Sequence, residues 1–503
     1  MNSFPKLLNH FWRRSSTTTP TDAQTNGPGS ADECLWFGVD LPFREATSHC
    51  MLAGATGSGK TTMLRLFMQG VLPRIGPGSG QRALVYDAKG DLMSLLPAIS
   101  PASIIKTTNP FDARGVAWNL HRDVREPRVA LQIAFTLIPE EQESQPFFSN
   151  AARHLMYGVM LSYILSGVEW TFADLMRGLD SSSRLRKILE RHDVTRSIVS
   201  NYFHDPRLLS NIMSTIATKL LPFHPIAAAW EHATEKISLE EWATNEMILL
   251  LGNSETSRKP IDAINRCMFR RACEIVLQQN ETLQPRTWFF LDELSEAGRL
   301  DGLVSLLKKG RSKGASVTLC FQSISGLRDS RLYGPHLTDE ILGQIGNRFF
   351  GRLECPETAE WASRLFGDQV VDQFTTSRTT SGQGSSTTEN QQIVTRRAVL
   401  PVEFMSIPPC DATNGLTAYF MVRSHGCFRT NFAGHSLFNG DLVPPAPGVP
   451  ELVPRSVEAQ YLLPWSTQQR LMFCGPVAKK PDKRSQRQKR KPDLDQLDEM
   501  DTL

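Results

Sequence analysis

The segment Gly54–Thr61, GATGSGKT, constrains the fold of this chain more than any other stretch. It follows the apolar run His49–Ala53 and precedes residues 61–72, whose apolar side chains recur at helical spacing. A glycine-rich loop between a strand and a helix turns its backbone N–H groups toward phosphate, and the positive end of the helix assists. The pattern predicts a nucleotide site. Its binding residues are expected to be Gly54, Ala55, Thr56, Gly57, Ser58, Gly59, Lys60, Thr61 and Thr62.

Four residues of this chain are expected to act on the phosphates, the metal and the water. Lys60 would place a positive charge at the β- and γ-phosphates, and the Thr61 hydroxyl can bind Mg²⁺. A second apolar run, Trp288–Leu291, ends in Asp292 and Glu293. Asp292 would hold Mg²⁺ through water, and Glu293 would act as the general base for the attacking water. An acid pair can also cap a following helix, but the presence of a phosphate loop favours the catalytic interpretation.

Two further polar residues stand at junctions between predicted elements. Gln322 ends the apolar run that starts at Ser316, where a neutral amide can sense the γ-phosphate or the attacking water; an ordinary strand-terminal polar residue is the alternative. Arg311 follows the predicted helix of residues 299–310. That position lies on the far side of the core from its own phosphate loop, so Arg311 could serve a neighbouring subunit as an arginine finger. A solvated cluster with the nearby lysines is equally consistent with the sequence.

The distribution of strand-like and helical segments predicts an α/β fold. Short, fully apolar strands separated by helical patterns are typical of a mostly parallel sheet that is covered on both faces. Between residues 127 and 243 the strands give way to apolar residues at helical spacing, which predicts an inserted all-α domain. The nucleotide-binding domain is then expected to comprise residues 35–126 and 244–443.

Three segments are expected to lie outside these domains or to lack regular structure. Residues 1–34 are predicted to be disordered, or alternatively to lie on a membrane surface through their apolar and basic residues. Phe374–Gln392 is predicted to be a low-complexity polar loop without fixed structure. Residues 444–503 are expected to form a proline-rich tail that turns basic and then acidic.

Global charge does not identify a partner, because the net charge of the 503 residues is only +3. No uninterrupted apolar run reaches the ~18 residues of a membrane-spanning helix, and the nine cysteines show no metal-ligand spacing, which indicates reduced thiols in the cytoplasm. Because the net charge is so low, any surface that binds nucleic acid must be a local concentration of basic residues. The candidate phosphate-contacting residues, each of which could equally be a solvated surface group, are Arg258, Lys259, Lys308–Lys313, Arg396 and Arg397.

Taken together, these motifs resemble the coupling proteins of bacterial conjugation and type IV secretion, a group of RecA-fold ATPases. The resemblance covers most of residues 35–440 and includes the phosphate loop. It also includes DAKGD (Asp87–Asp91), NPFDARGVAWNL (Asn109–Leu120), the segment Phe289–Ser323 and RAVLPVEFMSIPP near the end. The Asp-Glu, Gly-Arg and Gln series at this spacing is more specific than the phosphate loop alone.

The resemblance implies a RecA-like P-loop NTPase with a mostly parallel central sheet and an inserted all-α domain. It implies an active hexamer that hydrolyses ATP with Mg²⁺ and moves single-stranded DNA, or DNA linked to a relaxase, into a type IV secretion channel. By position, Arg311 would then act on the neighbouring subunit and Gln322 would sense phosphate. Such proteins commonly carry N-terminal transmembrane helices. This chain lacks them, so it is expected to be cytoplasmic and to reach the inner membrane through a partner.

Two other functions remain compatible with the sequence. One is a RecA-fold translocase of the HerA/FtsK kind, which acts on duplex DNA during chromosome processing. The other is a receptor or adaptor that recruits substrates and uses ATP mainly for assembly. The dependence of ATP hydrolysis on single-stranded DNA would separate these possibilities.

Overall fold

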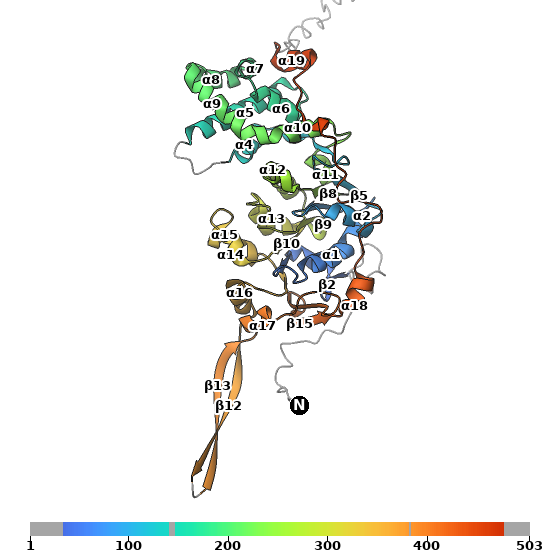
Figure 1. The fold of residues 1–503 in the computed structure, drawn as a ribbon, viewed down its shortest axis with the longest axis vertical. Helices are drawn as coiled ribbons and strands as arrows, with labels where there is room; N and C mark the ends of the chain where they lie inside the picture. Colours follow the sequence, from blue (N-terminus) through green and yellow to red (C-terminus); the bar gives the residue numbers. More distant parts are fainter. Residues whose placement is uncertain (1–33, 140–145, 382–383, 477–503) are drawn as a thin grey trace, which may run out of the picture.

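The computed structural model describes residues 34–139, 146–381 and 384–476 of the chain. The molecule is elongated, with a bundle of helices at one end, an α/β body in the middle and a long β-hairpin at the other end (Figure 1). Within the described ranges, no helix is both long enough and apolar enough to cross a membrane.

The α/β body is built on a nine-stranded sheet. Seven of its strands are parallel to one another, and the two at one edge, β14 and β15, are joined through antiparallel pairings. This confirms the expected α/β fold with a mostly parallel sheet. In spatial order the strands are β15 (Gly426–Phe432), β14 (Leu416–Val422), β11 (Asn347–Phe350), β3 (Cys50–Ala53), β10 (Lys313–Phe321), β9 (Thr282–Leu291), β4 (Arg82–Tyr86), β8 (Met247–Leu251) and β5 (Ile104–Thr107).

Helices cover both faces of this sheet, and successive residues of its inner strands enter two different cores. In β4, Ala83 and Val85 pack with α1 (Lys60–Val71) and α2 (Leu92–Ile99), whereas Leu84 and Tyr86 pack on the opposite face. Since a strand turns successive side chains to opposite faces, only a strand covered twice can be apolar throughout. The apolar runs seen in the sequence have this cause.

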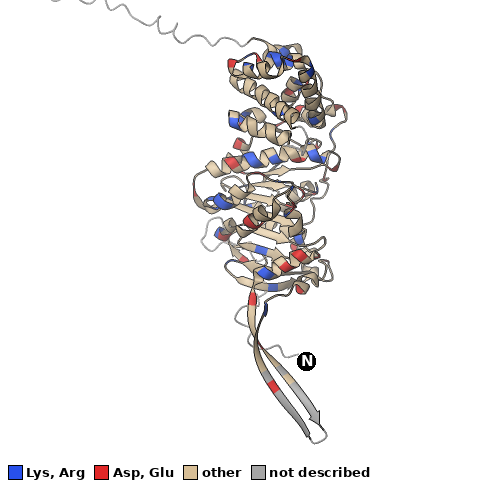
Figure 2. Cartoon of the chain, turned by 90° about the vertical axis from the view of Figure 1, so that its left-hand side faces the viewer, with Lys and Arg blue, Asp and Glu red and all other residues tan. Residues whose placement is uncertain are grey.

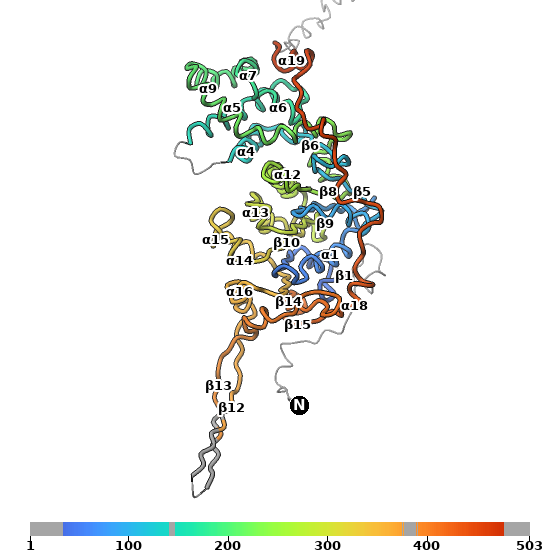
Figure 3. Tube along the Cα trace, viewed as in Figure 1, coloured from blue at the N-terminus to red at the C-terminus, as the bar shows by residue number. Residues whose placement is uncertain are grey.

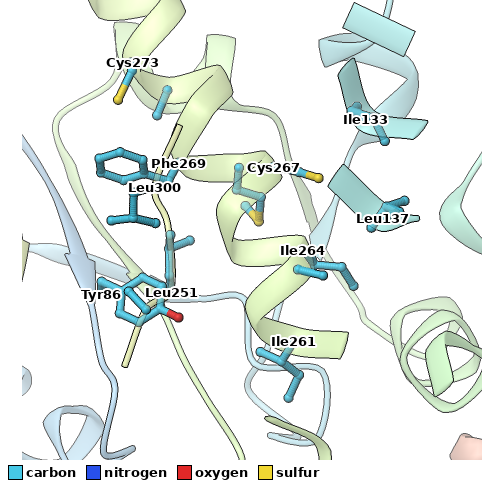
Figure 4. Packing of buried hydrophobic residues seen from close by; sticks show 14 of the residues in the cluster. Tyr86, Ile133, Leu137, Leu251, Ile261, Ile264, Cys267, Phe269, Cys273 and Leu300 are labelled. Atoms are coloured by element: carbon cyan, nitrogen blue, oxygen red, sulfur yellow. The ribbon is translucent and has the colours of Figure 1, made fainter. Parts of the chain in front are cut away.

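One face of the sheet connects to the helical bundle through α12 (Arg258–Gln278). Phe269 and Cys273 of this helix point toward the sheet, while Ile264 and Cys267 lie toward Ile133 and Leu137 of α4 (Pro127–Leu137) (Figure 4). All of these side chains belong to one continuous buried cluster. The helical bundle therefore packs on the body through a shared apolar core.

The bundle itself contains α4 and the six helices α5 (Phe147–Ser166), α6 (Phe172–Leu179), α7 (Ser182–Leu189), α8 (Asp193–Tyr202), α9 (Pro206–Leu220) and α10 (His224–Glu231). Local capping chemistry sets several of their ends. Helix α5 ends at Gly167, whose φ of 63° is left-handed and suits glycine. Helix α6 starts with a capping box between Thr171 and Asp174.

The short strands β6 (Ala117–Trp118) and β7 (Lys236–Ile237) pair where the chain enters and leaves the bundle. Helix α11 (Leu239–Thr244) follows β7 in the chain.

The expectation of an unstructured polar loop at Phe374–Gln392 is wrong. The chain forms a long antiparallel hairpin of β12 (Asp368–Ser381) and β13 (Gly384–Arg397), which projects from the body beside α16 (Pro356–Phe366) and α17 (Pro401–Met405) (Figure 1). Threonine and other β-branched residues favour strands, and cross-strand pairing satisfies the backbone even where no apolar core is available. A polar, low-complexity composition is therefore compatible with paired strands.

The first part of the expected C-terminal tail is also ordered. Residues 443–475, which we call the C-terminal strap, run from the body to the bundle and end in α19 (Thr467–Cys474) (Figure 3). Near its start, the Val443 carbonyl accepts a hydrogen bond of 2.7 Å from Arg65 of α1. At its far end, the Trp465 indole donates to Asp174 of α6 at 2.7 Å. The basic-then-acidic residues that follow lie outside the described residues, as do residues 1–33.

Candidate nucleotide-binding site

The phosphate loop leaves the carboxyl end of β3 and is fixed by its neighbours. Its first residue, Gly54, donates its N–H to Phe321 O at 3.3 Å, and Ala55 donates to Arg352 O at 2.7 Å. Gly57 and Gly59 adopt left-handed φ values of 72° and 89°. At Gly59, a Cβ atom would also stand 2.2 Å from a methyl group of Leu416. Only glycine fits there, so the backbone turns tightly into the N-terminus of α1.

The rest of the loop divides into an exposed tip and a buried base. Thr56 and Gly57 are exposed, whereas Ser58 and Lys60 are buried and Thr61 and Thr62 are partly exposed. The Lys60 ammonium donates to the carbonyls of Gly54 and, at 3.2 Å, of Ala55. Burial lowers the pKa of Lys60, and the nearby Glu293 opposes that shift. The lysine thus lies folded over the loop that it is expected to serve.

Asp292 and Glu293 follow the carboxyl end of β9, which β10 separates from β3. Both side chains are buried, with 5% and 3% exposed. Burial raises the pKa of each carboxyl; Lys89 opposes the shift at Asp292, and a 2.6 Å hydrogen bond from the Ser295 hydroxyl opposes it at Glu293. A desolvated carboxylate next to the phosphate loop suits a metal-linked or basic role.

The structure also brings Thr61 and Asp292 to a common cation. The ammonium of Lys89 lies 3.3 Å from the Thr61 hydroxyl oxygen and 3.7 Å from a carboxylate oxygen of Asp292. Two oxygen donors of the kind that Mg²⁺ prefers therefore converge on one positive group. A hydroxyl and a carboxylate are oxygen donors, so the two residues fit Mg²⁺ by their chemistry.

Gln322 and Arg311 lie at opposite ends of the same strand, β10. Gln322 is exposed and directly follows Phe321, whose carbonyl bonds to Gly54, so it stands beside the phosphate loop. Arg311 is exposed in the turn before Lys313. A strand of nine residues spans roughly 30 Å. Arg311 therefore does not meet the other site residues within one chain.

The loop after β4 takes part in the site, although sequence reasoning assigned it no role. Asp87, which is 1% exposed, accepts N–H bonds from Gly90 at 2.7 Å and Leu92 at 3.1 Å. Burial raises the pKa of Asp87 to about 7. These bonds fix the turn that carries Lys89. The signal was present in the sequence, because Asp87–Asp91 follows an apolar strand at the same sheet edge as the phosphate loop.

The candidate DNA-contacting residues do not form one patch. Arg258 is engaged by carboxylates of Glu255, Asp262 and Glu296, and Lys308 pairs with Glu340. Lys259 is exposed on α12, whereas Arg396 and Arg397 stand at the base of the hairpin. In Figure 2 the segments coloured for basic residues are interspersed with segments coloured for acidic residues along the body. The described residues thus offer separate basic positions on this face, not a continuous basic stripe.

Comparison with known proteins relates the whole arrangement to proteins of DNA transfer. Residues 35–422 match the family model described as the type IV secretion-system coupling protein DNA-binding domain. The chain is 24% identical over 357 residues to the coupling protein TraD of Escherichia coli, a match that covers 66% of this chain and 45% of TraD. It is 30% identical over 411 residues to the conjugal transfer protein TraG of Agrobacterium fabrum, covering 76% and 60% of the two chains.

Solved structures show the same fold. The conjugative coupling protein TrwBdeltaN70 has a TM-score of 0.63 at 20% sequence identity, with 89% of this chain and 96% of that chain covered. TrwB in complex with ADP and Mg²⁺ has a TM-score of 0.61 at 20% identity, with 88% and 98% covered. The chain spans less than two thirds of the length of the curated relatives TraD and TraG.

Proposed function

Because this chain belongs to the type IV secretion-system coupling protein family, we propose that it is an ATP-hydrolysing coupling protein of DNA transfer. One observation carries the catalytic part of the proposal. The hydroxyl of Thr61, from the phosphate loop, and the carboxylate of Asp292, from another strand, converge on a single cation position. Such convergence is what a nucleotide–metal site requires.

The site residues divide the work of hydrolysis. The backbone N–H groups of Gly57, Gly59 and Lys60 bind the phosphates, and the Lys60 ammonium turns from the loop carbonyls to the β/γ-phosphate oxygens. Thr61 and, through water, Asp292 would hold Mg²⁺, which would supply positive charge to those oxygens. Glu293, buried beside this position, takes a proton from the attacking water. The Gln322 amide, at the carboxyl end of β10, contacts the terminal phosphate and so senses the state of the nucleotide.

Arg311 is proposed to complete the site of a neighbouring subunit. Its place at the amino end of β10, roughly 30 Å from its own phosphate loop, favours action between subunits. Hydrolysis would then require assembly, and a hexameric ring is the proposed active form. The proposed substrate is single-stranded DNA, or DNA carrying a relaxase, which the ring passes to type IV secretion channel proteins. Contact with the inner membrane would come through such a partner.

The test is ATP hydrolysis with and without DNA. Single-stranded DNA should stimulate hydrolysis in the wild type, whereas Lys60→Ala and Arg311→Ala should each abolish the stimulated rate. Mixing the two inactive variants should restore part of the activity, because a Lys60→Ala subunit still supplies its arginine to a neighbour's intact phosphate loop. Hydrolysis that does not respond to DNA would overturn the motor function, and stimulation by duplex DNA alone would favour a HerA/FtsK-like translocase.

A mixture that recovers no activity would refute the role of Arg311 between subunits. Sedimentation of the wild type and of each variant provides the control for assembly. If Arg311→Ala fails to assemble, Arg311→Lys keeps the charge while removing the planar, bidentate guanidinium. Loss of hydrolysis in an assembled Arg311→Lys protein would then separate a catalytic contribution from a structural one.

A further inference from the structure

The turn between β4 and α2 holds a lysine inside the nucleotide site. Asp87 anchors this turn through the N–H groups of Gly90 and Leu92, and Gly90 adopts a left-handed φ of 79°. The turn places the Lys89 side chain at the carboxyl end of β9, where its ammonium contacts Thr61 and Asp292. A strand that is not adjacent to the phosphate loop therefore contributes a charge to it.

The charged groups around the Lys89 ammonium indicate that it neutralises Asp292. Asp292 is 5% exposed, and Lys89, 47% exposed, is its ion-pair partner among the described residues. Lys60 is instead directed at the carbonyls of Gly54 and Ala55. The buried carboxylate of Asp292 would be costly without a nearby positive charge. Lys89 supplies that charge from a flexible side chain that also reaches solvent.

We propose that Lys89 is an internal cation of the nucleotide site, which neutralises Asp292 and binds nucleotide polyphosphate in the absence of metal. Thr61 lies in the first turn of α1, directly after Lys60, so an anion arriving there meets the Lys89 ammonium as well as Lys60. A lysine is a compact charge on a four-carbon stem, which allows it to yield its place to a divalent cation. This inference rests on the proposed nucleotide-binding function.

The consequence is a difference between metal-free and metal-loaded binding. Without metal, Lys89 is the positive group between Thr61 and Asp292, so its loss should weaken nucleotide binding strongly. With Mg²⁺ present, the divalent ion neutralises the same oxygens, so the loss should matter little. A lysine that only stabilised the fold would weaken binding equally under both conditions.

The experiment measures binding of a fluorescent ATP analogue to the full chain by anisotropy, in EDTA and in Mg²⁺. We expect the wild type to bind in EDTA. Lys89→Met should weaken that binding about 10-fold or more, since a charged hydrogen bond contributes at this level. It should weaken binding in Mg²⁺ less than about 3-fold. Lys89→Arg should retain most of the metal-free binding, and it keeps the test open if the methionine variant misfolds.

The matched control is Lys106→Met. Lys106 lies on β5 of the same sheet and pairs with Glu235, outside the site. Its loss should leave both affinities unchanged. Wild-type binding that is absent in EDTA, or equal losses for Lys89→Met under both conditions, would overturn the inference. Failure of the wild type to bind nucleotide in Mg²⁺ would instead overturn the proposed nucleotide-binding function.

Discussion

His49, the residue just before β3, is predicted to make the stability of the nucleotide-binding body depend on pH. Its ring is 1% exposed and lies between two segments. The Val317 N–H donates to Nδ1 at 3.2 Å, so the ring proton is on Nε2, which donates to the Leu307 carbonyl at 3.0 Å. Both nitrogens are therefore satisfied in the neutral form. Burial and, to a smaller extent, the charge of Arg311 lower the pKa of His49 to about 4, while the bond to Leu307 opposes this shift.

The magnitude follows from the difference between the folded and unfolded pKa values. In the unfolded chain the imidazole has its ordinary pKa of 6.5. Between pH 6.5 and about 4 the unfolded state binds more protons than the folded state, so the stability is fully present above pH 6.5 and falls as the pH is lowered. From pH 7 to pH 5 this single group should reduce the free energy of unfolding by about 2 kcal/mol.

Urea unfolding followed by tryptophan fluorescence at pH 7, 6 and 5 measures this loss. The comparison is with His49→Asn, which removes the titrating ring and keeps a polar side chain at this position. The variant should be less stable at pH 7, but its stability should fall by about 2 kcal/mol less than that of the wild type between pH 7 and 5. His204→Asn, which removes an exposed imidazole, is the control. Parallel falls for the wild type and His49→Asn would refute the assignment.

Three further predictions test packing and the phosphate loop. Trp465→Ala should lower the free energy of unfolding by about 3–5 kcal/mol, because it leaves a buried cavity and removes the indole that donates to Asp174. A melting temperature within 1–2 °C of wild type would contradict a tightly packed strap. Gly59→Ala should destabilise the body by about 1–3 kcal/mol and weaken nucleotide binding, whereas Gly76→Ala, with open space around it, should do neither. Tyr86→Phe removes a buried 2.5 Å bond to a carboxylate of α12 and should cost about 1.5–3 kcal/mol in urea unfolding; unchanged stability would show that the bond contributes no net energy.

The predicted strands and their ends illustrate what local sequence can determine. A strand covered on both faces must be apolar throughout, and polar residues at its carboxyl end stand out against it. For this reason the apolar runs before Asp292 and Gln322 locate the carboxyl ends of β9 (Leu291) and β10 (Phe321). The strands β5 and β11 were missed. Each has only four residues, and β5 stands at the sheet edge with Ile104 53% exposed, which gives too short and too mixed a pattern.

The parts that sequence reasoning missed depend on contacts between distant segments. The C-terminal strap has no strong periodicity of its own, and its conformation is set by partners such as the Arg65 and Arg177 side chains, which donate to the Val443 and Leu463 carbonyls. Lys89 looked like an ordinary turn residue, because its contact with Thr61 is created only by the strand order of the sheet. Local propensity carries no information on such pairings.

The strand order also links the two roles proposed for the segment Phe289–Ser323. Because β9 and β10 are parallel neighbours, both carboxyl ends meet at the phosphate loop, while the turn containing Arg311 must lie at the opposite edge. The His49 ring is hydrogen-bonded to Leu307, in the helix before that turn, and to Val317 of β10. The residues that bind phosphate and the arginine proposed for the neighbour are thus joined by one strand of nine residues packed against β3. A displacement of β10 at one end would therefore reach the other end, and in the proposed ring this strand would link neighbouring nucleotide sites through the sheet.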